Sequence, residues 1–291
     1  MPTLYALLLE SVAPAGIYAL VSVGLVLIYR ATKVLNFAQG GMVLIGAYLL
    51  FSLQGSLSIA LRIVVLLIVS GLIGAAIYYG LLDRLLGHSP LSIVMMTIVL
   101  STFLESIVGL AWGQDGDVSL ILPVSTGPVR LPGGGVIGAS DILIGAVAVV
   151  FVALVGCLLR FTRIGLSMRA AADNSGLASY RGVNVRRTSA IAWGLSMVAA
   201  TLAGVGSGAL DGVNGNLLDI GLAAFPALLL GGVDSIVGVC IASVILGFLG
   251  SIIQTYLSAD WLNPLMYSIL LVTVLVRPSG LMGTPETARR V

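Results

Sequence analysis

The sequence predicts an all-α protein that crosses a lipid bilayer about eight or nine times. Of its 291 residues, 58% are hydrophobic and only 9% are charged. A soluble chain carries about a quarter of its residues as Asp, Glu, Lys and Arg, so this chain has too little charge to solvate a surface of its own. Because the apolar stretches are spread along the whole chain, we expect a single transmembrane domain over residues 1–291.

Eight stretches without a charged residue have about the length that a membrane helix needs. A helix crosses the apolar core of a bilayer with about 20 residues. The charge-free stretches are 11–29, 34–61, 63–82, 85–104, 142–159, 188–210, 235–259 and 261–276. The fourth continues as an apolar segment over 91–112 despite Glu105. A ninth, shorter run at 220–233 contains Pro226 and many small residues, so we interpret it as a broken or tilted span.

The basic residues indicate how these spans are oriented. Lys and Arg are held on the cytoplasmic side of a membrane. With nine crossings and the N-terminus outside, twelve of the fourteen basic residues fall on the cytoplasmic side, and so does the C-terminus. Only Arg62 and Arg130 then lie outside. With eight crossings, the basic residues near one end of the chain would lie outside, so the charges favour a ninth crossing.

Two connections between spans are long. The outer one, 113–140, is rich in Gly and Pro, which favours turns and irregular chain; it either contacts a ligand or partner or simply joins two spans. The inner one, 160–187, carries six arginines. Its Ala-rich centre favours a short helix that shows Leu177 and Tyr180 on one face and ends at Gly182. This loop either fixes topology and contacts lipid headgroups or docks a cytoplasmic protein.

Three polar side chains within the spans are candidates for a site. Glu105 lies in an apolar span, where a charge is costly and usually faces a cavity, a partner or the bundle interior. It is either a ligand or proton site, or a buried structural acceptor beside Ser101 or Thr102. Asn36 and Gln39 are three residues apart, so one helical face would hold both, where they either line a pathway or bond across helices.

Several motifs, in order along the chain, resemble a known family. The run Asn36-Phe37-Ala38-Gln39-Gly40, followed by Gly46-Ala47-Tyr48, resembles the NFAQG…GAY signature of the LivH-type permease subunits of branched-chain amino acid ABC transporters. Further similar segments are Arg163-Ile164-Gly165, Arg169-Ala170, 178–183, Leu230-Gly231-Gly232 with Ser235 and Gly238, and 277–283. Together these segments cover most of the chain.

The resemblance implies a transport subunit that has no catalytic residues and binds no metal or cofactor itself. Its implied partners are a second, LivM-like permease subunit, two cytoplasmic ATPase subunits that use ATP and Mg, and a periplasmic substrate-binding protein. The complex would lie in the bacterial cytoplasmic membrane, in contact with its lipid. The translocation pathway is expected at Asn36, Phe37, Gln39 and Gly40, with Glu105 as a further candidate. The inner loop would contact the ATPase through Gly176, Leu177, Ala178, Ser179, Tyr180, Arg181 and Gly182.

The sequence departs from the family at two positions that bear on the ligand. Many relatives carry an acidic residue where this chain has Gly41, and a lysine where it has Ala223. If those two charges pair with each other, their joint loss is close to neutral. If either faces the path, the ligand here is less polar than a zwitterionic amino acid. Leucine, isoleucine and valine are the family default, with urea, short amides or organic acids as alternatives.

Other functional classes find less support in the sequence. An ATP-independent channel or secondary transporter usually carries several ionisable groups within the membrane, and Glu105 is the single candidate here. A membrane enzyme needs a nucleophile, a metal cluster or a His and acid constellation, and His88 is the only histidine. A net charge of +2 gives no indication of nucleic-acid binding. The sequence therefore favours an importer permease.

Overall fold

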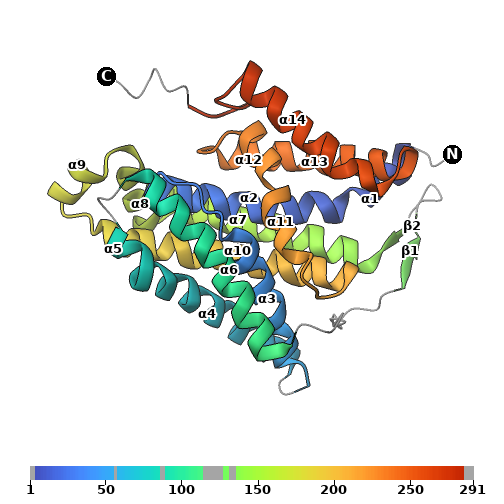
Figure 1. Cartoon of the computed structure of the whole chain (residues 1–291), viewed down its shortest axis with the longest axis horizontal. Helices are drawn as coiled ribbons and strands as arrows, with labels where there is room; N and C mark the ends of the chain where they lie inside the picture. The colour runs from blue at the N-terminus through green and yellow to red at the C-terminus, as the bar shows by residue number, and fades with distance from the viewer. Residues whose placement is uncertain (1–3, 56–57, 86–88, 114–126, 131–135, 285–291) are drawn as a thin grey trace.

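The computed structural model describes residues 4–55, 58–85, 89–113, 127–130 and 136–284. This part of the chain is a bundle in which most of the long helices run in broadly the same direction (Figure 1). Helices α8 (Arg163–Asp173) and α9 (Ser175–Tyr180) lie at one end of the bundle, and strands β1 (Pro128–Arg130) and β2 (Val136–Gly138) lie at the other. The described parts of the two long connections therefore occupy opposite ends of the bundle.

Seven helical segments among the described residues are long and apolar enough to cross a membrane. They are α1 (Leu4–Glu10) with α2 (Val12–Thr32), α4 (Ile59–Ile77) with a π-helical turn (Tyr78–Leu82) and α5 (Asp83–Leu85), α6 (Pro90–Trp112), α7 (Ala139–Phe161), α10 (Val185–Asp211), α13 (Ile236–Tyr256), and a 3-10 turn (Ala259–Trp261) with α14 (Leu262–Val276). Two shorter apolar segments are α3 (Gln39–Leu53) and the pair α11 (Leu217–Ala223) and α12 (Phe225–Gly231). These nine segments match the predicted spans, which confirms the all-α polytopic fold.

Helices α2 and α10 form the centre of the bundle, and α10 packs closely on α3. Without a hydrophobic driving force in lipid, helices associate where small residues let their backbones approach. A Cβ atom on Gly204 of α10 would lie 2.2 Å from the Val43 carbonyl oxygen of α3. A Cβ atom on Gly46 of α3 would lie 2.4 Å from the Cα atom of Thr201. The two glycines therefore allow a separation that no other residue type would permit.

Helix α3 begins near the middle of the bundle and not at its end. The preceding helix α2 stops at Lys33, which has a left-handed backbone (φ 59°) and donates its amide to the Tyr29 carbonyl. The chain then returns without helix to Gln39, whose Nε2 atom would lie 2.7 Å from a Cβ atom on Gly24. Gly24 is eight residues from the end of α2, or roughly 12 Å at helical rise. Helix α3 thus starts close to mid-depth in a core about 30 Å thick.

The ninth predicted span is interrupted in the same region. Helix α11 ends and α12 begins on either side of Ala224, with Pro226 in the first turn of α12. A proline is tolerated there because its missing amide would have no helical partner. The Ser22 hydroxyl of α2 donates to the Ala224 carbonyl at 3.2 Å, which fixes the interruption against the centre of the bundle. The prediction of a broken segment at 220–233 is confirmed.

The outer connection differs in part from the irregular chain that its composition predicts. Strands β1 and β2 pair antiparallel, with Val129 opposite Ile137. The Gly138 amide then donates to the Asp141 carboxylate at 3.2 Å, which caps the start of α7. Residues 114–126 and 131–135 of this connection lie outside the described residues.

Candidate functional site

The polar residues of the first motif form a buried network at the start of α3. The Asn36 Oδ1 atom accepts the Ala38 amide at 3.0 Å, and its Nδ2 atom donates to Gln39 Oε1 at 3.2 Å. The same Gln39 oxygen accepts the hydroxyl of Ser196 of α10 at 3.1 Å. Asn36 is 1% exposed, and Gln39 and Ser196 are fully buried. These hydrogen bonds hold the non-helical segment against α10, and the Gln39 Nε2 atom is buried beside them with no hydrogen-bond partner among the described residues.

The expectation that Asn36 and Gln39 share one helical face is wrong in its geometry. Asn36 precedes α3 and turns back on its own chain, because its side chain accepts the amide two residues on. The two side chains still meet, through this turn and not through helical spacing. Both are buried within the chain in this conformation. Their role as pathway residues stays a prediction.

Phe37 and Gly40 join the start of α3 to α6, α11 and α12. The Phe37 amide donates to the Thr97 hydroxyl of α6 at 3.2 Å. Its ring stacks on Phe225 of α12, with the ring centroids 5.1 Å apart. A Cβ atom on Gly40 would lie 2.2 Å from the Leu218 carbonyl oxygen of α11. The motif therefore brings the start of α3 into contact with α11 and α12, on either side of the break at Ala224.

Glu105 lies apart from this network, on the exposed face of α6. Its neighbours Thr102 and Ser106 are exposed as well, and the Ser106 hydroxyl donates to the Thr102 carbonyl at 2.8 Å. Glu105 is therefore exposed in the single chain, and both interpretations of it stay predictions. The adjacent side of α6 packs on α3, where a Cβ atom on Gly41 would lie 3.1 Å from the Ser101 carbonyl oxygen.

This contact also explains one of the two departures from the family pattern. A Cβ atom at Gly41 would need α6 to give way by a few tenths of an ångström, and a longer acidic side chain would need more room. The glycine at position 41, in place of an acidic residue, thus accompanies a close contact between α3 and α6. Ala223, the second position, is half-buried at the end of α11. No contact between Gly41 and Ala223 is seen among the described residues.

The inner loop forms two short helices with polar caps, whereas one was predicted: the Ala-rich run belongs to α8, and Leu177 and Tyr180 belong to α9. The Thr162 hydroxyl accepts the Gly165 amide at the start of α8, and Asn174 Oδ1 accepts the Leu177 amide at the start of α9. Gly182 follows α9 with φ +82°, a conformation that favours glycine. Leu177 is 63% exposed and Tyr180 is 90% exposed, whereas Ala178 between them is buried. Gly176, Ser179 and Arg181 are exposed too. Helix α9 thus presents an apolar and aromatic face at the end of the bundle.

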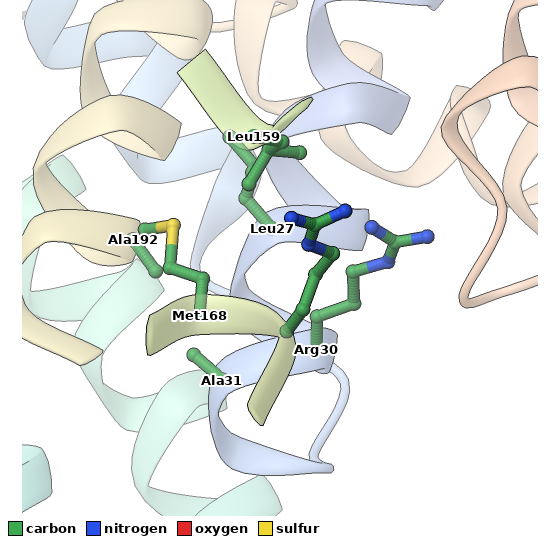
Figure 2. A pocket seen from close by; sticks show the side chains of 7 residues that line it. Leu27, Arg30, Ala31, Leu159, Met168 and Ala192 are labelled. Carbon is green, nitrogen blue, oxygen red and sulfur yellow. The ribbon is translucent and has the colours of Figure 1, made fainter. Parts of the chain in front are cut away.

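A contact that the sequence did not reveal attaches this loop to the membrane helices. Met168 of α8 lies beside Ala192 of α10, Leu159 of α7 and Leu27 of α2, around a small cavity that Arg30 and Arg169 also line (Figure 2). Arg30 donates from Nε to the Asp234 carbonyl at 2.8 Å, which links α2 to the turn between α12 and α13. Helix α8 is therefore in direct contact with α2, α7 and α10.

The arrangement defines a class of protein: a polytopic helical membrane protein with interrupted segments at mid-depth and a short exposed helix at one end. Discontinuous helices near the middle of the membrane are typical of transporters. A family model described as "Branched-chain amino acid transport system / permease component" matches residues 7–275. The chain belongs to this family of permeases.

Two relatives are permeases of this kind, and one solved structure shares the fold. The chain is 29% identical to the high-affinity branched-chain amino acid transport system permease protein LivH of Escherichia coli K12, over 94% of this chain and 93% of the relative. It is 28% identical to the permease protein BraD of Pseudomonas aeruginosa, over 99% and 100%. The fold resembles PsaBC from Streptococcus pneumoniae with a TM-score of 0.52 and 17% identity, over 94% of this chain and 92% of that one.

Proposed function

We propose that this chain is the permease subunit of an ATP-driven importer for branched-chain or other small hydrophobic amino acids. The proposal is supported by the two relatives, which are branched-chain amino acid transport permeases and align over nearly their whole length. The chain then pairs with a second, LivM-like permease subunit, and two cytoplasmic ATPase subunits use ATP and Mg. A periplasmic binding protein delivers the ligand. The complex lies in the bacterial inner membrane, with the N-terminus outside and the C-terminus in the cytoplasm.

The exposure of Glu105 within α6 is the observation on which we base the position of the pathway. Glu105 lies seven residues from the end of α6, roughly 10 Å inside the helix. A carboxylate that faces lipid at the centre of a helix costs about 2.5–3.5 kcal/mol. The polar stripe of Thr102, Glu105 and Ser106 therefore faces the second permease subunit and a water-accessible path between the two subunits. There the carboxylate binds the ammonium group of the amino acid through a charge-assisted hydrogen bond.

The buried network at the start of α3 packs against α6, on which Glu105 lies, and stabilises the position of this path. Phe37, stacked on Phe225, and Gly40, against α11, hold the interrupted segments in register with α6. Asn36 and Gln39 fix the depth at which α3 begins. A pair of packed segments of this kind has a small number of discrete arrangements, which alternating access requires.

Helix α9 is the proposed contact with the ATPase, within a cytoplasmic loop over 160–187. Leu177 and Tyr180 are largely exposed, and they lie next to α8, which packs on α2, α7 and α10. Closure of the ATPase pair moves α9, and α8 passes this movement to the membrane helices. Substitution of Tyr180 by Asp is expected to abolish ligand-stimulated ATP hydrolysis and import, with the subunit still in the membrane. The variant Tyr180→Phe keeps the ring and is expected to retain both activities.

The decisive experiment reconstitutes the co-purified complex in proteoliposomes with ATP in the compartment of the ATPase subunits and radiolabelled leucine with the binding protein on the other side. Import that depends on ATP is expected, and it is expected to fall at least tenfold in Glu105→Gln without a change in the unfolding temperature. The variant Glu105→Asp retains the charge and serves as the control. Leucine uptake that proceeds without ATP would favour a channel. Competition by urea, short amides or organic acids, but not by valine, would contradict the amino-acid assignment.

A further inference from the structure

An apolar groove runs between α4 and α7, with α10 as its floor. Two adjoining cavities of about 220 and 480 Å³ form it. Both cavities are lined by Ile63 and Leu67 of α4, Val147 of α7 and Leu202 of α10, so they are parts of one groove. Neither Glu105 nor any residue of α9 lines it. The groove is therefore separate from the pathway and from the coupling loop.

The groove has the length and the lining that an acyl chain needs. Along α7 it extends from Leu143 to Leu158, or roughly 22 Å at helical rise. One leaflet of a bilayer core is about 15 Å thick, so the groove is longer than one leaflet. Its lining is aliphatic and aromatic apart from Gly206 and one charged residue. A helix of another protein, about 10–12 Å across, is too thick for cavities of this volume.

Arg62 is the only charged side chain among the residues that line the groove. It lies in the first turn of α4, close to the end of a membrane-spanning segment, and it is half-buried. An arginine at this depth lays its aliphatic part along apolar surface and directs its guanidinium toward the lipid headgroups. The planar guanidinium binds a phosphate with two parallel hydrogen bonds.

We propose that the groove holds an acyl chain of a phospholipid whose phosphate binds Arg62. The apolar length of the groove and the single positive charge at its end match the two parts of such a lipid. Transfer of an acyl chain from the bilayer to an apolar groove brings no hydrophobic gain, because lipid tails are as apolar as leucine. The selectivity for a bound lipid over bulk lipid therefore comes from the contact between Arg62 and the phosphate.

The test measures lipid retention by the whole transporter complex. The delipidated complex is titrated with phosphatidylglycerol and examined by native mass spectrometry. We expect one tightly held lipid for each copy of this chain, and at least a fivefold lower occupancy in Arg62→Gln. Arg160→Gln is the matched control, because Arg160 is exposed near the other end of α7, and it is expected to leave the occupancy unchanged.

A second measurement places the lipid within the groove. Phosphatidylglycerol with a diazirine on its acyl chain is expected to cross-link to peptides of α4, α7 or α10. Val147→Trp fills the groove while Arg62 is retained, and it is expected to abolish these cross-links. Equal lipid occupancy in the original chain and in Arg62→Gln would overturn the proposal. Cross-links from p-benzoylphenylalanine in place of Leu67 to another protein subunit would overturn it as well.

Discussion

Replacement of Gly40 by alanine tests whether this glycine lines the pathway or holds two interrupted segments together. A Cβ atom on Gly40 lies 2.2 Å from the carbonyl oxygen of Leu218 and 3.1 Å from its carbonyl carbon. Ordinary van der Waals contact begins at 3.4 Å. The difference between 3.4 and 2.2 Å means that α11 moves about 1.2 Å away from α3 in the variant. Both partners are backbone atoms, so no side-chain rotation can relieve the clash.

The size of this effect follows from the cost of overpacking an interior. Extra atoms in a well-packed core cost about 1–3 kcal/mol, and we expect the upper half of that range because no flexible group is involved. At about 2–4 °C per kcal/mol, the unfolding temperature of the purified complex falls by roughly 4–12 °C. Import falls as well, because the displaced α11 no longer supports the path.

Gly156→Ala in α7 is the matched control, measured by the same thermal unfolding of the complex in detergent. A Cβ atom at Gly156 meets nothing within 4 Å, and alanine favours a helix by about 1 kcal/mol over glycine. Its unfolding temperature is therefore expected to stay constant or rise slightly. If Gly40→Ala has the same unfolding temperature as the unmodified protein and yet fails to import leucine, Gly40 lines the pathway and the packing argument is refuted.

Two further predictions concern buried hydrogen bonds. Gln39→Leu removes the acceptor that Asn36 and Ser196 share, and it also removes the buried Nε2 atom, which has no partner among the described residues. Because two buried donors lose their acceptor and one unpaired donor disappears, we expect a net loss of about 1–3 kcal/mol. Thermal unfolding checks this, and the double variant with Ser196→Ala should lose less than the two single variants combined. Arg30→Met removes the bond to the Asp234 carbonyl, and we expect faster hydrogen exchange in α8 and in the turn after α12. Unchanged exchange there would show that Arg30 does not attach the loop.

The nine membrane segments could be predicted because their signal is local. Hydropathy and the absence of charge over about 20 residues depend on each segment alone, so 11–29 and 188–210 correspond directly to α2 and α10. The same holds for α9, since Asn174 caps the helix and Gly182 terminates it through their own backbone preferences. The interruption at Pro226 was predictable for this reason too.

The candidate site was predictable only in its residue types. That Asn36 and Gln39 belong together was predicted, but their third partner, Ser196, is 157 positions from Gln39 and has no local signature. The exposure of Glu105 depends on which side of α6 meets α3, and the small residue that decides it, Gly41, lies on another helix. Arg30 looked like one of many topology-determining charges, although its contact with Asp234 is specific.

The position of α3 in the membrane depends on a helix that the ribosome makes much later. Helix α3 has 15 residues, roughly 22 Å long, which is shorter than a core of about 30 Å. Gly46 of α3 packs against Thr201 of α10, and residues 54–184 are synthesised between the two helices. In that interval the Asn36 segment lacks Ser196, which it needs in lipid. We therefore expect biogenesis in two stages, in which α3 settles into the bilayer only after more than half of the chain has left the ribosome.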